Sequence, residues 1–327
     1  MGTTVREGVP LVSVVLPTYE RPEMLVEAVE SVASQRYPAV ELIVVDDGSE
    51  TPTREILAEH APDGLDWRCL EHDHNRGANA ARNTGIRAAE GEILAFLDDD
   101  DTWYPDKLDA QVSAFEAEGE AVGVVVVGQR FVNRDGETTT IRLPDPEIGE
   151  NATPALLSGA AAGPFSTIAV RRSVLESAGL PDEEFPAWQD REWLVRLSAH
   201  CEFAPVRRPL VERRLGDYEQ IGDAFEPKRD ETYPRFVEKH RDLAAEYGRE
   251  RVFVATLAAR IAGAGLDKGH YGDARRFAAK AIRTSPRIRS AYLYLALALA
   301  GRHVHRSAVK FKRTIERLRW GRGDGWS

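Results

Sequence analysis

The chain has little cysteine and lacks long apolar runs, and each shortage excludes a class of protein. Only Cys69 and Cys201 occur among its 327 residues, and two distant cysteines form neither a disulfide framework nor a zinc site. The longest apolar run, 291–300, is about half of the roughly 20 residues that a membrane-spanning helix needs. At 43% hydrophobic residues the chain can nevertheless bury a core. We therefore expect a folded protein of the reducing cytoplasm.

Three common catalytic motifs are also missing. There is no Gly-x-x-x-x-Gly-Lys-Ser/Thr phosphate loop, no Gly-x-Gly-x-x-Gly after a predicted strand, and no Gly-x-Ser-x-Gly elbow. Functions that depend on these motifs receive no support from the sequence.

The net charge of −10 is unevenly distributed along the chain. From Lys268 to the end there are 15 Lys and Arg against 3 Asp and Glu, a balance of +12, so the first 267 residues carry −22. Acidic and basic parts on one chain indicate two modules with different partners.

Short apolar runs alternate with amphipathic segments along the first 130 residues. This alternation predicts an α/β fold, in which a mostly parallel sheet is covered by helices on both faces. We expect strands at 12–16, 41–45, 67–70, 93–97, 122–127 and 168–170. We expect helices at 22–32, 52–60, 79–89, 105–118, 172–178 and 188–199.

Polar clusters follow three of the predicted strands. They are Pro17–Arg21, Asp46–Ser49 and Asp98–Asp101. Ligands of parallel α/β sheets bind beyond the carboxyl ends of the strands, so we expect the three clusters to share one site.

The run Asp98–Asp101 is the strongest candidate for chemistry. Four adjacent carboxylates repel one another unless a cation offsets their charge. Carboxylate oxygens suit hard cations such as Mg²⁺ and Mn²⁺, and such an ion can stabilise a diphosphate leaving group. Taken alone, the run is equally consistent with a solvated acidic turn.

Two other acidic positions are ambiguous when considered singly. Asp46–Ser49 has the composition of an ordinary turn, although a carboxylate there could accept a hydrogen bond from a nucleoside. Asp190 begins a predicted helix, where a carboxylate serves either as a cap or as the general base for an acceptor hydroxyl.

A cationic stretch, Asn75–Asn83, precedes the fourth predicted strand. Arg76 or Arg82 could hold phosphate, because a guanidinium group donates two parallel hydrogen bonds. His72 and His74 lie just before this stretch. Their spacing does not suit a metal site on a helix, and we interpret both as surface residues.

Together these segments resemble the family 2 inverting glycosyltransferases, which have the GT-A fold. The segments that carry the resemblance are Val12–Arg21, Leu42–Ser49, Asn75–Gly85, Phe96–Leu108 and Gln189–Arg196. They are similar to the family's first strand and loop, its nucleotide-binding turn, a segment near the donor, its DxD region, and the start of the helix that carries the base. The resemblance covers roughly residues 10–225, and Glu20 stands where the family usually has Asn.

The resemblance implies a role for each matching residue. The sugar nucleotide donor would contact Pro17, Thr18, Tyr19, Glu20, Arg21, Asp47, Gly77, Arg82, Asp98 and Asp99. Asp100 would bind Mn²⁺ or Mg²⁺, and Asp190 would be the catalytic base. The implied reaction moves a sugar with inversion from a nucleotide-diphosphate donor to an acceptor hydroxyl or lipid phosphate, in cell-surface glycan or lipid-linked oligosaccharide assembly.

The predicted organisation is a GT-A domain at 1–230 and a basic helical region at 231–327. We expect 134–165 to be loop, and 217–229 to be a mobile loop that could close over the donor. Basic, amphipathic helices near the end predict a peripheral protein on an anionic membrane surface, at the cytoplasmic face, that acts on a polyprenyl-phosphate carrier. Ordinary helix packing with solvated arginines is the alternative. Nothing indicates a nucleic-acid partner.

Two rival functions remain open from sequence. Asp98-x-Asp100-x-Thr102 also fits the nucleophile motif of haloacid-dehalogenase-type phosphatases, in which Asp98 would be the nucleophile. That motif normally lies on the first strand, whereas two strand–turn clusters precede it here. A non-catalytic sugar- or nucleotide-binding module is the second rival, and it would have no need of a base at Asp190.

Overall fold

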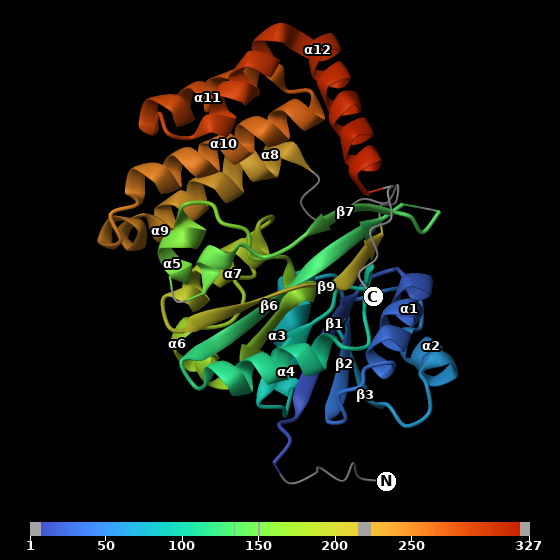
Figure 1. Cartoon of the computed structure of the whole chain (residues 1–327). Helices are drawn as coiled ribbons and strands as arrows, with labels where there is room; N and C mark the ends of the chain where they lie inside the picture. Colours follow the sequence, from blue (N-terminus) through green and yellow to red (C-terminus); the bar gives the residue numbers. More distant parts are fainter. Residues whose placement is uncertain (1–7, 134, 150, 215–223, 321–327) are drawn as a thin grey trace. The chain divides into compact units, whose positions relative to one another are not determined.

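The parallel strands predicted from the alternating pattern form one half of a nine-stranded sheet. A computed structural model describes residues 8–133, 135–149, 151–214 and 224–320, of which 306–320 are described by backbone alone. In the sheet, β3, β2, β1 and β4 are neighbours in that order and run parallel. Figure 1 labels the first three of these strands. Their bounds are β1 Val12–Thr18, β2 Val40–Asp46, β3 Asp66–Glu71 and β4 Ile93–Phe96.

The other half of the sheet is mixed. The order continues from β4 through β8, β6 and β9 to β5, with β7 beside β6. Only β6 and β9 pair in parallel here, and the other contacts are antiparallel. The bounds are β5 Asp101–Trp103, β6 Val122–Val132, β7 Thr138–Arg142, β8 Ile168–Arg171 and β9 Glu202–Arg214.

Helices cover both faces of the parallel strands because successive side chains of a strand point to opposite faces. Val14 and Leu16 of β1 belong to the core beneath α1 (Pro22–Ala33), α2 (Thr53–His60) and α4 (Lys107–Glu118). Val15 faces α3 (Ala78–Ala88) instead. A Cβ on Gly85 of α3 would lie 2.5 Å from Val15 Cγ1, so only glycine allows this close approach.

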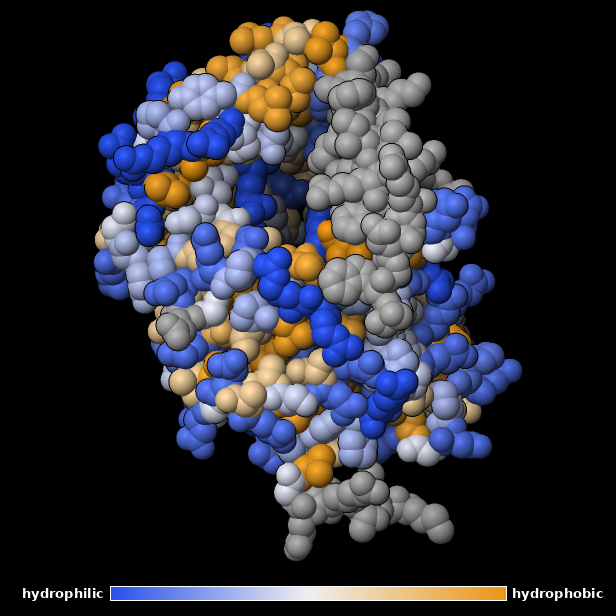
Figure 2. Space-filling model, in the orientation of Figure 1, coloured by the Kyte–Doolittle hydropathy of each residue, from blue (hydrophilic) through white to orange (hydrophobic). Residues whose placement is uncertain are grey.

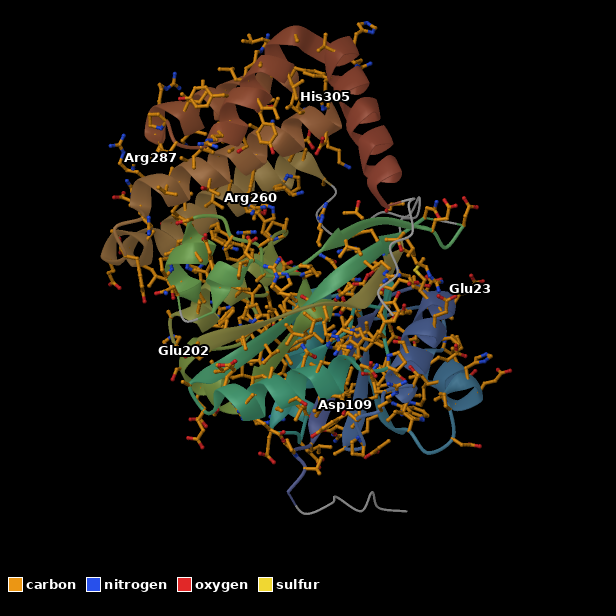
Figure 3. The ribbon with its side chains drawn as sticks, in the orientation of Figure 1. Glu23, Asp109, Glu202, Arg260, Arg287 and His305 are labelled. Carbon is orange, nitrogen blue, oxygen red and sulfur yellow. The ribbon has the colours of Figure 1, made fainter. Side chains whose placement is uncertain are left out.

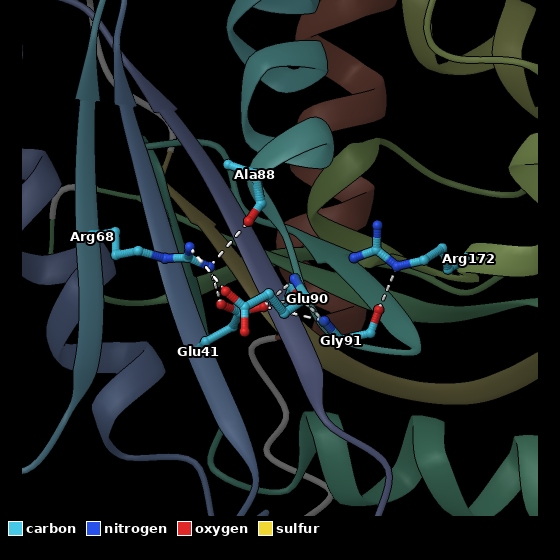
Figure 4. Close-up of polar contacts among 7 residues, drawn as sticks. Glu41, Arg68, Ala88, Glu90, Gly91 and Arg172 are labelled. Atoms are coloured by element: carbon cyan, nitrogen blue, oxygen red, sulfur yellow. Dashed lines mark hydrogen bonds and ion pairs between the residues drawn. The ribbon is translucent and has the colours of Figure 1, made fainter. Parts of the chain in front are cut away.

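A buried carboxylate fastens the amino ends of the parallel strands (Figure 4). Glu41 at the start of β2 accepts hydrogen bonds from the Ser13 hydroxyl at 2.5 Å and from the amides of Glu90 and Gly91 at 2.6 and 3.1 Å. It also forms an ion pair with Arg68 of β3. These bonds tie together β1, β2, β3 and the turn before β4, at the edge opposite the predicted site.

The chain divides into two compact units, which we call the sheet unit and the helical unit. The sheet unit is Met1–Ala152, Ala161–Glu183 and Gln189–Gly216. The helical unit is Thr153–Ala160, Glu184–Trp188 and Asp217–Ser327.

The smaller helical segments are distributed over both units. In the sheet unit they are η1 Pro146–Ile148, η2 Phe165–Thr167, η3 Arg172–Val174, α6 Leu175–Ala178 and α7 Gln189–Ser198. The helix α5, Ala152–Leu157, falls almost entirely within the helical unit.

The helical unit consists mainly of helices from residue 225 onward. They are α8 Phe225–Pro227, a π-helical turn Lys228–Thr232, α9 Tyr233–Glu246, α10 Glu250–Lys268, α11 Tyr271–Thr284 and α12 Arg289–Trp320. Gly301 has non-helical angles, so α12 comprises two helices joined there. Figure 3 labels Arg260, Arg287 and His305 on this unit. Within the described residues, none of the helices is both long and apolar enough to span a membrane.

Local structure differs from the expectations in three places. Residues 134–165 are not simply loop, because they contain β7, η1 and α5. The strand β9 was not predicted, since its arginines and prolines hide the apolar alternation. Of the segment predicted as a mobile loop, 217–223 lies outside the described residues, and 225–229 is helical.

Candidate active site

The three predicted polar clusters meet at the carboxyl edge of the parallel strands. The amide of Asp47, after β2, donates to the carbonyl oxygen of Thr18, the last residue of β1, at 2.9 Å. The Thr18 hydroxyl donates to Asp99, which follows β4, at 2.9 Å. Arg21 donates to the other oxygen of Asp99 at 3.0 Å and lies 3.7 Å from Asp100. The sheet topology therefore brings Pro17–Arg21, Asp46–Ser49 and Asp98–Asp101 together.

The four consecutive aspartates have different surroundings. Asp99 faces Thr18 and Arg21, whereas Asp98, Asp100 and Asp101 each direct one carboxylate oxygen toward a common point, with these oxygens within 4.8 Å of one another. Asp98 and Asp101 thus join the predicted ligand Asp100.

Asp101 is the most buried member of the run, at 1% exposure. As the first residue of β5 it stands opposite Arg213 of β9, and its carboxylate lies 3.8 Å from Arg213 Nε. Neither oxygen meets hydrogen-bond geometry, although the Ser166 hydroxyl is close enough to lower its pKa. A buried carboxylate with incomplete hydrogen bonding is suited to a cation.

Burial raises the pKa of three of these carboxyl groups. The pKa of Asp101 is raised to about 8 by desolvation, which Asp100 and Asp98 reinforce and Arg213 opposes. That of Asp99 is raised to about 6 by desolvation, against the lowering effect of Arg21. Desolvation and the charge of Asp98 also raise the pKa of Asp100. Burial and mutual repulsion therefore outweigh the neighbouring arginines, and the cluster is short of positive charge.

A divalent cation fits this cluster. Asp98, Asp100 and Asp101 offer only carboxylate oxygens, the donor set that Mg²⁺ and Mn²⁺ prefer. Asp101 also has two buried oxygens that meet no hydrogen-bond geometry. A metal bound there would supply the positive charge that the raised pKa values indicate is lacking.

Asp47 organises the loop that precedes α3. Its buried carboxylate accepts hydrogen bonds from the amides of Arg76 and Gly77 at 2.9 and 2.7 Å and pairs with His72 Nδ1 at 2.7 Å. The other ring nitrogen of His72 contacts the Thr84 hydroxyl at 2.9 Å. The interpretation of His72 as a surface residue was wrong, since its side chain is only 6% exposed. In the sequence His72 alternates with His74, which is exposed, and this spacing gave no sign that His72 is buried beside Asp47.

The β1–α1 loop is fastened to the β2–α2 loop by Glu20. The Glu20 amide donates to the Ser49 hydroxyl at 2.9 Å, and its carboxylate accepts from the Glu50 amide at 2.5 Å. Glu20 has φ 54°, one of two positive-φ residues other than glycine in the described chain. Tyr19 beside it is 45% exposed, whereas Pro17 and Thr18 at the end of β1 are buried.

Gly48 allows a close backbone crossing in the same loop region. Its φ is 84°, and a Cβ there would lie 2.5 Å from the backbone of His74. A hollow of roughly 320 Å³ opens beside this crossing. It is lined by Asp46, Gly48, Ser49, Glu50, Thr51, Pro52, Thr53, Arg54, Glu55, Glu71 and His72.

Arg82 is buried rather than presented to solvent. Its guanidinium donates to Asp98 at 2.5 Å, Asn79 at 3.0 Å and Gln189 at 3.3 Å, and lies 3.9 Å from the centre of the Phe165 ring. These contacts leave little of the group available for a donor phosphate. Sequence reasoning identified this arginine as important but not the partners that occupy it.

Asp190 lies in the first turn of α7, half-buried by accessible surface. It accepts a hydrogen bond from the amide of Arg191 at 2.7 Å. Desolvation raises its pKa, opposed by Arg191 and Arg82 and reinforced by Asp98. The neighbouring residue Gln189 accepts a hydrogen bond from Arg82, which also donates to Asp98, so the start of α7 is linked to the Asp98 side of the cluster. A raised pKa suits a group that must take up a proton.

The residue two positions before Asp190 is strained. Trp188 has φ 56°, a conformation that costs a residue other than glycine about 1–3 kcal/mol. Such strain persists only where the surroundings hold the backbone in place, and it commonly marks functional sites. Glu20 and Trp188, the two strained positions, therefore both border segments with predicted site residues.

Comparison with known proteins gives consistent results. The family model described as Glycosyl transferase family 2 matches residues 13–178. An uncharacterized glycosyltransferase of Nostoc sp. is 33% identical over 171 residues, 50% of this chain and 52% of that protein. The Escherichia coli UDP-Glc:alpha-D-GlcNAc-diphosphoundecaprenol beta-1,3-glucosyltransferase WfaP is 29% identical over 192 residues, 58% of this chain and 70% of that protein. The chain thus spans about half the length of the Nostoc relative.

Among solved structures, that of S. aureus TarS 1-349 in complex with UDP-GlcNAc is similar, with a TM-score of 0.59 and 19% identity. The similarity covers 82% of this chain and 83% of that one, and it shows a shared GT-A fold. The match to the family model includes all three loop clusters and half of the sequence. The chain therefore belongs to glycosyl transferase family 2.

Proposed function

We propose that this protein transfers a sugar, with inversion, from a nucleotide-diphosphate donor to an acceptor in cell-surface glycan or lipid-linked oligosaccharide assembly. One observation supports this most directly. A carboxylate cluster suited to a cation lies at the carboxyl edge of the parallel strands, and Arg82 links its member Asp98 to Gln189, the residue before Asp190. Donor and acceptor chemistry would meet between them. We assign this chemistry to residues 1–230.

The donor would be held by the three loops at this edge. Pro17 and Thr18 end β1, and Tyr19, Glu20 and Arg21 follow in the first loop. Asp47 belongs to the second loop, and Asp98 and Asp99 belong to the third. Gly77 contributes through the loop that Asp47 holds. Arg21 and Arg213 lie 3.0 Å from Asp99 and 3.8 Å from Asp101, and we expect these cationic side chains to face the charge of the diphosphate.

The metal of this site would be Mn²⁺ or Mg²⁺, held by Asp100 with Asp98 and Asp101. When bound, it would stabilise the charge of the departing diphosphate. Asp99 would stay turned away, held by Thr18 and Arg21, and would keep the first loop against the third.

On the acceptor side, Asp190 would act as the general base. The acceptor oxygen forms a bond to the anomeric carbon while the bond from that carbon to the diphosphate breaks. The acceptor proton passes to Asp190, and the nucleoside diphosphate leaves from the opposite face. A single displacement of this kind inverts the anomeric configuration.

A lipid-linked acceptor at an anionic membrane surface is the acceptor we favour. WfaP is named for a diphosphoundecaprenol-linked acceptor. Among the side chains that the structure describes, four of the six exposed large apolar ones lie on α12, namely Tyr292, Leu293, Leu299 and Val304. Figure 2 shows apolar surface gathered over the start of α12. Residues 268–305 also contain eight Lys and Arg against one acidic residue, Asp273. The basic residues at 306–327 have side chains outside the described part.

The test of the function is sugar transfer with a panel of nucleotide sugars, Mn²⁺ or Mg²⁺, and an undecaprenyl-diphosphate-linked acceptor. Wild-type protein should release nucleoside diphosphate only with acceptor and metal present. Asp100→Asn should lose most of this activity and the metal dependence of donor binding. Full turnover of the wild type in EDTA would reject the metal role.

Asp190→Asn separates catalysis from binding, because Asn keeps the shape but accepts no proton. Donor binding should survive, while transfer should fall by a factor of order 10² or more. Turnover near the wild-type rate would assign the base to another residue, and absence of transfer by the wild type would favour a binding module. Family membership leaves the phosphatase alternative at Asp98 without support.

A further inference from the structure

The guanidinium group of Arg82 joins two parts of the site that are distant in sequence. One nitrogen donates to Asn79 and Gln189, and another donates to Asp98. Asp98 follows β4 and belongs to the carboxylate cluster, whereas Gln189 is the first residue of α7. Arg82 therefore spans the distance between the predicted donor side and the helix that begins beside Asp190.

The surroundings of Arg82 restrict where the group can lie. Its side chain is 5% exposed, and Phe165 lies against the guanidinium plane at 3.9 Å. Asn79, one turn earlier on α3, accepts from it at 3.0 Å. A planar group with fixed donor directions, stacked and hydrogen-bonded in this way, transmits its position to its partners.

The same face of α3 also holds the chain that leads to α7. The side-chain amide of Asn79 donates to the carbonyl oxygen of Asp182 at 2.8 Å. The side-chain amide of Asn83 donates to the carbonyl oxygen of Pro181 at 2.9 Å and to the carboxylate of Glu183 at 2.8 Å. Residues at i, i+3 and i+4 share one face of a helix, so Asn79, Arg82 and Asn83 act as a single surface.

We propose that Arg82 is a positioning residue, which holds the start of α7 at a set distance from the carboxylate cluster, rather than a ligand of the donor phosphates. The importance of that distance rests on the proposed function of Asp190. In a single displacement the base and the leaving group lie on opposite sides of one carbon. A small displacement of either costs rate without costing affinity.

The experiment compares Arg82→Lys, Arg82→Met and Gln189→Leu with the wild type. We expect the Kd for the nucleoside diphosphate to change less than threefold in Arg82→Lys and Gln189→Leu, while kcat falls roughly tenfold to a hundredfold. The double variant that combines Arg82→Lys with Gln189→Leu should lose little more kcat than either single variant, because the two residues share one interaction. Arg87→Met, at an exposed position of the same helix, is the matched control and should leave both constants unchanged.

A phosphate ligand would give the opposite pattern. Weaker nucleotide binding with an unchanged kcat in Arg82→Lys would overturn the proposal. Additive losses in the double variant would do so as well.

Amide hydrogen exchange provides a readout that does not need activity. If Arg82 positions α7, Arg82→Lys should increase exchange at residues 181–192 and leave β1 and β2 protected. Unchanged protection at 181–192 would reject the inference whatever the activity. Lost protection there, in a protein whose wild type transfers no sugar, would support the inference and reject the proposed function instead.

Discussion

At the scale of a single residue, Lys107 is unusual because its basic side chain is fully buried. It is 0% exposed, donates to Gln111 at 2.7 Å, and lies 3.6 Å from the centre of the Trp103 ring. Within the described residues it forms no ion pair. Desolvation lowers its pKa well below 10.5. The unfolded chain therefore binds a proton that the folded chain releases more easily.

This difference predicts how stability depends on pH. Between the lowered pKa and 10.5 the unfolded state carries more protons, so the free energy of unfolding of the wild type rises with pH. Lys107→Met removes the titration and should flatten that rise. Urea unfolding of both proteins from pH 7 to 10 measures it. A difference in stability that is independent of pH would show that Lys107 titrates normally.

Asp47 carries a second prediction at this scale. Its carboxylate holds the amides of Arg76 and Gly77, so Asp47→Ala should loosen the loop as well as remove any contact to the base. We expect affinity for the nucleoside diphosphate to fall about tenfold, as for the loss of a charged hydrogen-bond acceptor. Asp73→Ala, at an exposed position before the same loop, is the control. Unchanged affinity for UDP, GDP and dTDP would remove Asp47 from the site.

At the scale of the secondary-structure element, the acidic residues at the two ends of the parallel strands differ in their hydrogen bonding and in the direction of their pKa shifts. At the carboxyl ends, Asp100 and Asp101 have raised pKa values, and neither carboxylate oxygen of Asp101 meets hydrogen-bond geometry. At the amino ends, Glu41 is saturated with hydrogen bonds, and the effect of these bonds lowers its pKa although burial opposes it. The amino ends of the strands are thus stabilised by hydrogen bonds, and the carboxyl ends carry the proposed site.

Glu41→Gln tests whether the Glu41 carboxylate stabilises the amino ends of the parallel strands. Because the folded pKa of Glu41 is lowered, its contribution is complete above the ordinary value of 4.5 and is lost as pH falls through the folded pKa. The variant should be less stable by about 1–3 kcal/mol at pH 7, and the difference should shrink under acidic conditions. Denaturant midpoints at pH 7 and below 4 measure both values. A difference that grows in acid would contradict this account.

At the scale of the whole molecule, charge is unevenly distributed along the chain. The first 267 residues carry −22, and those from Lys268 onward carry +12. In the helical unit, Leu293 and Leu299 of α12 are 57% and 65% exposed, in a segment that Arg289 and Arg302 flank in the sequence. Exposed apolar side chains with basic residues suit an anionic lipid surface, to which each basic group contributes about 1 kcal/mol.

Sedimentation with phosphatidylglycerol vesicles tests this surface. The full chain should bind at low salt and dissociate as salt rises. Leu293→Glu with Leu299→Glu should bind at least tenfold less, because acidic groups replace apolar contacts and repel the anionic surface. Tyr247→Glu, at an exposed apolar position on another part of the helical unit, should bind as the wild type does. Equal binding by all three proteins would reject attachment through α12.

Much of the fold was determined by local sequence. The strands at 12–18, 40–46 and 93–96 appear where apolar runs end in turn-forming residues, because these signals act over a few neighbouring positions. Their parallel order then required the three acidic and polar loops to meet at one edge. Family membership followed from the same segments, since the matching motifs lie in those loops.

Other features depended on contacts between distant residues. The pairing of Asp101 with Arg213 needs β5 beside β9, and the burial of His72 needs Asp47 and Thr84 on either side of it. Among the four aspartates, only the tertiary structure turns Asp99 away from the other three. Hydrophobic periodicity and turn composition depend on residues that are close together in the sequence. The direction of a polar side chain is decided by partners that folding brings from elsewhere.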